Sequence, residues 1–161
     1  MMMDNDKALR EHVLYVLRGG GAHIDFEGVV KDFPLGSINR KVEPIPYTPW
    51  QVLEHMRIAQ WDILEFSRNA GHVSPKWPEG YWPGDDVVPG ESEWNESVKA
   101  FRADLKEMEK LLEDTSIDLF APIAHGEGQT ILREALLVAD HNAYHLGVLA
   151  TLKRLLGASG K

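Results

Sequence analysis

The sequence predicts an all-α protein, a four-helix bundle with long loops, formed by a single domain over residues 1–161. Three observations predict this fold class. Apolar residues recur at helical spacing in four long segments, strand-like alternation is nearly absent, and stretches rich in proline and glycine separate the segments. A chain of 161 residues without a repeat or a linker is long enough to bury one core and fits one domain.

The N-terminal third contains the first two predicted helices. One is predicted over about residues 5–18, and the three glycines at 19–21 end it because glycine readily adopts positive φ. A shorter helix is predicted over about residues 25–32, before Pro34. Residues 35–47 contain two prolines and are expected to form an extended connector.

The clearest helix start is the segment TPWQVLEHMRIAQWDILEF, which begins at Thr48. Thr48 and Gln51 match a capping box, and Pro49 suits the first helical position. The helix is predicted to run to about Asn69, and Gly71 marks its end. Its apolar residues recur every three or four positions and form the stripe expected to face the core, which consists of Val52, Met56, Ala59, Ile63 and Phe66.

A loop of about twenty residues follows, with the sequence GHVSPKWPEGYWPGDDVVPGES. Loops of this length in a compact domain are usually functional or disordered. Trp77, Tyr81 and Trp82 favour order, because disordered segments are poor in aromatic residues. We therefore expect an ordered flap on the bundle, whose aromatic rings either cover apolar surface or wall a substrate pocket.

Two further long helices complete the predicted bundle. The first spans about residues 92–113, and the last spans about residues 131–156 and ends at Gly157. The loop between them contains Pro122. Four substantial helices joined by long loops are thus expected to share one core.

Composition and charge exclude several classes of function. The net charge of −8 and the lack of a basic run argue against nucleic acid as the main partner and against a membrane surface. No apolar run approaches the 18 residues that a membrane span needs. The charged N-terminus lacks the apolar region of a signal peptide, so a cytoplasmic location is expected. Because cysteine is absent, imidazole and carboxylate must hold any metal, and any thiol must come from a co-substrate.

The segment DHNAYHLG places two histidines, His141 and His145, four residues apart on the last predicted helix. Such residues differ by about 40° around the helix and by about 6 Å along it. The same face carries four apolar residues, so the pair is predicted to point into the bundle: Leu137, Val138, Val148 and Leu152. Two desolvated imidazoles are either hydrogen-bonded core residues or metal ligands, and the spacing alone leaves both interpretations open.

His55 favours the metal interpretation. It lies midway along the second long helix, at the edge of the apolar stripe, where it can meet the last helix at a similar depth. Three imidazoles from two helices leave coordination positions open, which is typical of catalytic metal sites. No HExxH, GxSxG or phosphate-loop motif is present. Surface or turn roles are expected for the remaining histidines, which are His12, His23, His72 and His125.

Three residues lie close to the histidines by helical angle and are the candidate catalytic residues: Gln51, Asp62 and Glu134. Each can orient a metal ligand or accept a proton. The simpler interpretation of the two carboxylates is a helix-edge position in solvent. Asp140 is expected to project elsewhere, as a surface charge or as a partner of Arg133.

The His55 helix, LEHMRIAQWDILEFSRN, is followed about eighty residues later by LLVADHNAYHLGVLATLKRLLG. Together these segments resemble the DinB-like family of bacterial four-helix bundles, also described as DinB/YfiT-type metalloenzymes. The resemblance covers nearly the whole chain and includes the YWP loop. It implies a divalent metal ion, nickel or zinc, bound by His55, His141 and His145.

The resemblance also implies an activity and a homodimer. Relatives of this fold include thiol-dependent S-transferases and a thiol-dependent isomerase, so a metal-dependent S-transferase or hydrolase is expected. Its partners would be a small-molecule substrate and a low-molecular-weight thiol. Trp50 and Trp61, which lie off the apolar stripe, are candidates for the dimer contact. The alternative is a non-catalytic dimeric metal- or ligand-binding module of a stress response.

Overall fold

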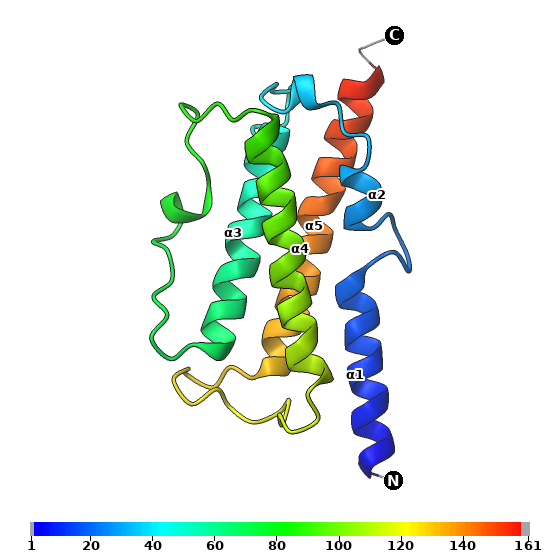
Figure 1. The fold of residues 1–161 in the computed structure, drawn as a ribbon, viewed down its shortest axis with the longest axis vertical. Coiled ribbons are helices and arrows are strands. Elements are labelled where there is room, and N and C mark those ends of the chain that lie inside the picture. The colour runs from blue at the N-terminus through cyan, green and yellow to red at the C-terminus, as the bar shows by residue number, and fades with distance from the viewer. Residues whose placement is uncertain (1, 159–161) are drawn as a thin grey trace.

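The computed structural model describes residues 2–158, which form α-helices and short 3-10 helices and no strand. The α-helices are α1 (Met2–Arg18), α2 (Phe26–Val30), α3 (Pro49–Arg68), α4 (Glu91–Glu113) and α5 (Ile131–Ala158), and the 3-10 helices are η1 (Leu35–Ser37) and η2 (Glu79–Tyr81). Three long helices, α3, α4 and α5, pack side by side, and α1 and α2 follow one another along the fourth position (Figure 1). The predicted four-helix bundle is confirmed, and α1 and α2 together occupy one of its four positions.

The start of α3 follows the predicted capping box. The Thr48 hydroxyl accepts a hydrogen bond from the Gln51 amide at 3.1 Å, and the Gln51 side-chain oxygen accepts one from the Thr48 amide at 3.0 Å. The predicted limits of α4 are also confirmed to within one residue. The predicted end of α5 is wrong, because Gly157 continues the helix. An exposed glycine within a helix costs only about 1 kcal/mol relative to alanine, so it does not force an end.

The core consists of two clusters along the bundle. One combines residues of α2, α3, α4 and α5, and the other combines residues of α1, α3, α4 and α5 with loop residues Leu119 and Ile123. Trp50 belongs to the first cluster and is only 7% exposed, so its expected place at a dimer contact is wrong. The connector folds back over it: Phe33 and Ile38 lie in the same cluster, and the Trp50 amide donates to the Ile38 carbonyl at 3.0 Å.

The loop between α3 and α4 is fastened to the bundle by side-chain hydrogen bonds. The Gln51 amide donates to the Pro83 carbonyl at 3.2 Å and to the Asp85 carboxylate at 3.0 Å. The Asn39 amide donates to the Pro89 carbonyl at 2.8 Å. The predicted ordered flap is therefore confirmed. Within residues 2–158, no helix is both long enough and apolar enough to cross a bilayer.

Candidate metal centre

Three histidines from two helices meet between α3 and α5. His55 on α3 is 2% exposed, and His141 and His145 on α5 are half-buried. The Nε2 atom of His55 lies 3.0 Å from that of His141 and 3.1 Å from that of His145. Nitrogen atoms of all three rings lie within 4.8 Å of one another, in an arrangement that could hold a metal ion. The three residues singled out from helical spacing thus come together in space.

Aromatic packing fixes the orientation of the His55 ring. Trp82 stacks on it with ring centroids 3.7 Å apart and an interplanar angle of 5°. Tyr47 stacks on Trp82 at 4.1 Å. Tyr47 comes from the connector and Trp82 from the loop after α3, so two loops hold one ring of the cluster in place.

The hydrogen bonding of His55 sets its tautomer. Its Nδ1 lies 3.0 Å from the backbone carbonyl oxygen of Tyr81, and a carbonyl can only accept, so Nδ1 carries the proton. The lone pair is then on Nε2, which faces His141 and His145. Metal-binding histidines usually have such a partner on the other ring nitrogen, because it orients the ring and increases its basicity.

Burial also keeps the three rings neutral. Desolvation lowers the pKa of His55. Burial, with a smaller contribution from neighbouring imidazoles, lowers the pKa of His141 and of His145 to about 4. Neutral imidazole is the form that binds metal ions.

The separations measured from His55 fit a divalent cation. Nitrogen ligands 2.0–2.1 Å from zinc, with angles of 90–109° between them, are separated by about 2.8–3.4 Å. The Nε2 separations of 3.0 and 3.1 Å from His55 to His141 and His145 fall in that range. Nδ1 of His141, which is buried without a hydrogen-bond partner, is the ring nitrogen that is not paired with His55. A cation bound by the facing nitrogens would compensate the crowding of three imidazoles.

Asp62 belongs to a second polar cluster beside the first. Its carboxylate accepts a hydrogen bond from the Tyr81 hydroxyl at 2.6 Å and lies 2.7 Å from Nε2 of His72. The expected solvent position of Asp62 is wrong: the residue is 9% exposed, because the loop after α3 folds over it. Of the surface or turn role expected for His72, the turn is confirmed, since its amide donates to the Asn69 carbonyl at 3.0 Å, and the surface position is wrong, since its side chain is only 7% exposed. Burial and the hydrogen bond to Asp62 raise the pKa of Tyr81 to about 12.

The other two candidate catalytic residues do not contact the imidazoles. Gln51 uses its side-chain amide for the capping box and for the loop around Asp85. Glu134 is 3% exposed and lies 2.5 Å from the Arg133 guanidinium, so its expected solvent position is also wrong. Glu134 lies in the first turn of α5, two turns before His141. Arg133 forms its ion pair with Glu134 and not, as one expectation had it, with Asp140.

A groove of about 680 Å³ lies over the three histidines. Asp140 is exposed, as expected of a surface charge, but it does not project away from the site: it lines this groove together with Glu79 of η2, and neither carboxylate was predicted to belong to the site. The groove extends beyond the face of α5 that carries the histidines, and it therefore includes Asp140, the residue directly before His141. The only sequence signal for Asp140 is its place directly before His141, and nothing in the sequence indicates Glu79.

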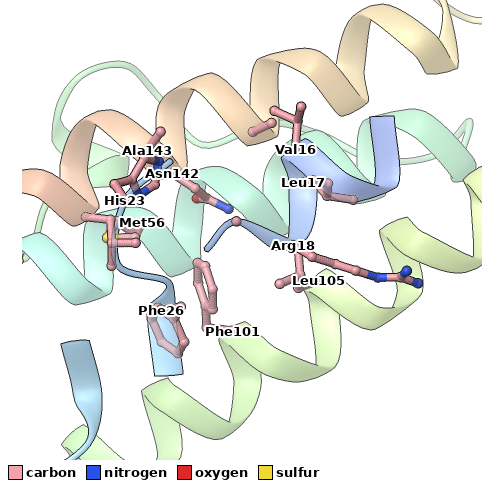
Figure 2. Close-up of a pocket in the computed structure, with 13 residues that line it drawn as sticks. Val16, Leu17, Arg18, His23, Phe26, Met56, Phe101, Leu105, Asn142 and Ala143 are labelled. Atoms are coloured by element: carbon pink, nitrogen blue, oxygen red, sulfur yellow. The ribbon is translucent and has the colours of Figure 1, made fainter. Parts of the chain in front are cut away.

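A second cavity, of about 70 Å³, is lined by residues of α1, α2, α3, α4 and α5 and by none of the three clustered histidines (Figure 2). Phe26, Met56 and Phe101 line it, with Asn142 from α5 (Figure 2). The Asn142 amide donates to the side-chain oxygen of Gln60 at 2.8 Å. The described part of its lining brings no metal-binding group of residues together. The groove over the histidines is therefore the candidate functional site.

Comparison with known families assigns the chain to one of them. A family described as the DinB superfamily matches residues 22–149 of the chain, which is well over half of its length. The chain belongs to the DinB superfamily. No curated protein and no solved structure matches the chain. The DinB match includes the whole of α3 and α4 and all three clustered histidines, and it confirms the resemblance inferred from the two histidine segments.

Proposed function

We propose that this chain is a metal-dependent enzyme that holds one divalent ion with His55, His141 and His145. It would act on a small molecule as an S-transferase that uses a low-molecular-weight thiol, or as a hydrolase. The single observation that carries the proposal is the convergence of three neutral imidazoles at the floor of an open groove. Three protein ligands leave positions open for other molecules, as in catalytic sites.

A divalent ion in this position supplies Lewis acidity, which lowers the pKa of a thiol or a water molecule enough to give a nucleophile near neutral pH. The residues of the chain supply the remaining functions. The Tyr81 carbonyl holds the proton of His55 on Nδ1, and Trp82 keeps the ring in place. The carboxylates of Glu79 and Asp140 line the groove, where they can accept the proton that a nucleophile releases.

The first test is metal uptake by purified protein, measured by elemental analysis after dialysis against zinc or nickel. We expect one ion per chain in the wild type and a loss of at least about 100-fold in affinity in His145→Ala, because one of three ligands is missing. His12→Ala is the control, since His12 is an exposed histidine on α1. Equal uptake by the wild type and His145→Ala would reject the metal site.

The second test is activity of the metal-loaded protein with thiols plus electrophiles and with hydrolytic substrates. Turnover that is lost in His145→Ala supports the enzyme. A metal-loaded protein that is inert in every assay would instead favour the non-catalytic dimeric metal- or ligand-binding module. The choice between nickel and zinc, the homodimer and the cytoplasmic location stay predictions, which metal competition, sedimentation and fractionation can each test.

A further inference from the structure

The groove over the histidines continues into a second compartment along α5. The first compartment has a volume of about 680 Å³, and the second has a volume of about 610 Å³. The second extends from the connector residues Pro44 and Ile45 to Thr151 on α5. The two compartments share four lining residues, so they lie next to each other: Tyr47, Trp82, Tyr144 and His145.

Apart from histidine, the charged side chains that line this groove are of one sign, and they are carboxylates. Among the described residues that line it, there is no lysine or arginine in either compartment. The first compartment carries the two carboxylates of Glu79 and Asp140. The described lining of the second compartment has no acidic or basic side chain other than His145. Glu79 lies 3.8 Å from the Lys76 ammonium, whereas the second compartment offers an anionic group no cationic side chain, in a protein whose net charge is already −8.

The walls of the groove are aromatic. Trp82 lies between the rings of Tyr47 and His55, with which it stacks at 4.1 and 3.7 Å. Two further rings at the groove stay largely exposed: Trp77 at 68% and Tyr144 at 71%. Large aromatic side chains left exposed around a concave surface are typical of ligand-binding sites.

We infer that the second compartment binds an uncharged, largely apolar part of an organic molecule. For the reactive end, which would lie over the histidines, the inference rests on the proposed function. Proline, isoleucine, valine and aromatic side chains of the second compartment provide the apolar contact. The lack of a cationic side chain in the second compartment selects against an anionic group there.

Gly147 offers a direct way to test the second compartment. It lines that compartment, and a Cβ atom added to it would meet no heavy atom within 4 Å. The first atom of a new side chain therefore has room, so Gly147→Leu adds apolar bulk at the compartment and Gly147→Lys adds a cation there. Leucine and lysine both favour a helix more than glycine does, so α5 is retained. Gly157→Leu is the matched control, because Gly157 lies on the same helix in open space and does not line the groove.

The experiment compares two probes of the same shape, neutral 2-naphthalenemethanol and anionic 2-naphthalenesulfonate, by calorimetric titration. We expect the wild type to bind the alcohol at least about tenfold more tightly than the sulfonate once the metal content has been measured and the metal removed with a chelator, because a bound divalent ion would itself attract the sulfonate. Gly147→Leu should weaken alcohol binding by about tenfold or more, while Gly157→Leu leaves it unchanged. Gly147→Lys should tighten sulfonate binding and reduce the preference.

The inference is overturned by equal or tighter binding of the sulfonate, or by a Gly147→Leu variant that binds the alcohol as Gly157→Leu does. Metal content measured in the same samples separates this result from the proposed function. A preference for the alcohol without metal uptake supports the inference and rejects the metal enzyme. Metal uptake without that preference rejects the inference and leaves the metal centre standing.

Discussion

Two clusters of buried polar residues lie side by side on α3, and their histidines differ in what they contact. In one cluster, His72 lies 2.7 Å from the Asp62 carboxylate, which also accepts the Tyr81 hydroxyl at 2.6 Å. In the other, His55 faces two more imidazoles at 3.0 and 3.1 Å. A histidine beside a carboxylate is satisfied within the protein, whereas three imidazoles that face one another form a group that could hold a metal ion.

Tyr81 connects the two clusters. Its carbonyl oxygen accepts a hydrogen bond from Nδ1 of His55, and its hydroxyl donates to Asp62. The cluster of Asp62, His72 and Tyr81 thus holds the backbone segment that orients the His55 ring in the cluster of three histidines. Under the proposed metal site, His55 would be a ligand and Asp62 a positioning residue, and the predictions below test this division.

The largest effect is expected for His141→Gln. Glutamine keeps a polar side chain but offers a much poorer metal ligand than imidazole, so the affinity for zinc should fall by about 100-fold or more. Competition with a chromophoric chelator measures this change. Unaltered zinc affinity would show that His141 is an ordinary buried histidine like His72.

A smaller effect on metal affinity is expected for Asp62→Asn. The amide is a weaker acceptor for the Tyr81 hydroxyl, so the carbonyl that orients His55 is held less firmly, and zinc affinity should fall by about tenfold. Glu134→Gln is the matched control, because Glu134 is also a buried carboxylate but contacts Arg133 and not the clusters. Both variants can unfold more easily, but only Asp62→Asn should lose zinc affinity. Equal zinc affinity in the two variants would contradict the positioning role.

The Asp62–Tyr81 pair also predicts a pH dependence. The folded-state pKa of Tyr81 is raised to about 12, so the neutral phenol is favoured by folding. Its contribution to stability is complete below about pH 10, the ordinary tyrosine pKa, and is lost as the pH rises towards 12. Absorbance at 295 nm after a rapid pH jump should show a late phenolate step that is absent from Tyr81→Phe. Asp62→Asn should move the step to lower pH, and an unmoved step would contradict the coupling.

The sequence predicted those features that depend on one helix at a time. The limits of α3 follow from the Thr48 capping box, and the shared face of His141 and His145 follows from their spacing of four. Nickel or zinc, and the reaction itself, are beyond what such spacing determines. Imidazole ligands bind several divalent metals with affinities that follow the same order in most sites.

Features that depend on how loops cover the helices were not predicted. Helical angles give the direction of Asp62 on α3, but its burial depends on His72 and Tyr81, which reach it from the following loop. Trp50 was assigned to a dimer contact because the connector that covers it, around Ile38, has no helical pattern. The place of Asp140 in the groove likewise depends on the width of a cavity formed by four segments, which are the connector, α3, the loop after α3 and α5.

The smallest effect is expected for His72→Gln, the same substitution as at His141. The glutamine amide can donate to Asp62 as the imidazole does, so the variant should lose at most about 1 kcal/mol of stability. Its zinc affinity should equal that of the wild type, because His72 contacts the carboxylate and does not contact the three clustered imidazoles. Chemical denaturation and zinc competition on the two glutamine variants measure both quantities. If His72→Gln lost zinc as His141→Gln does, the two clusters would form one metal site, and the division between ligands and positioning residues would be wrong.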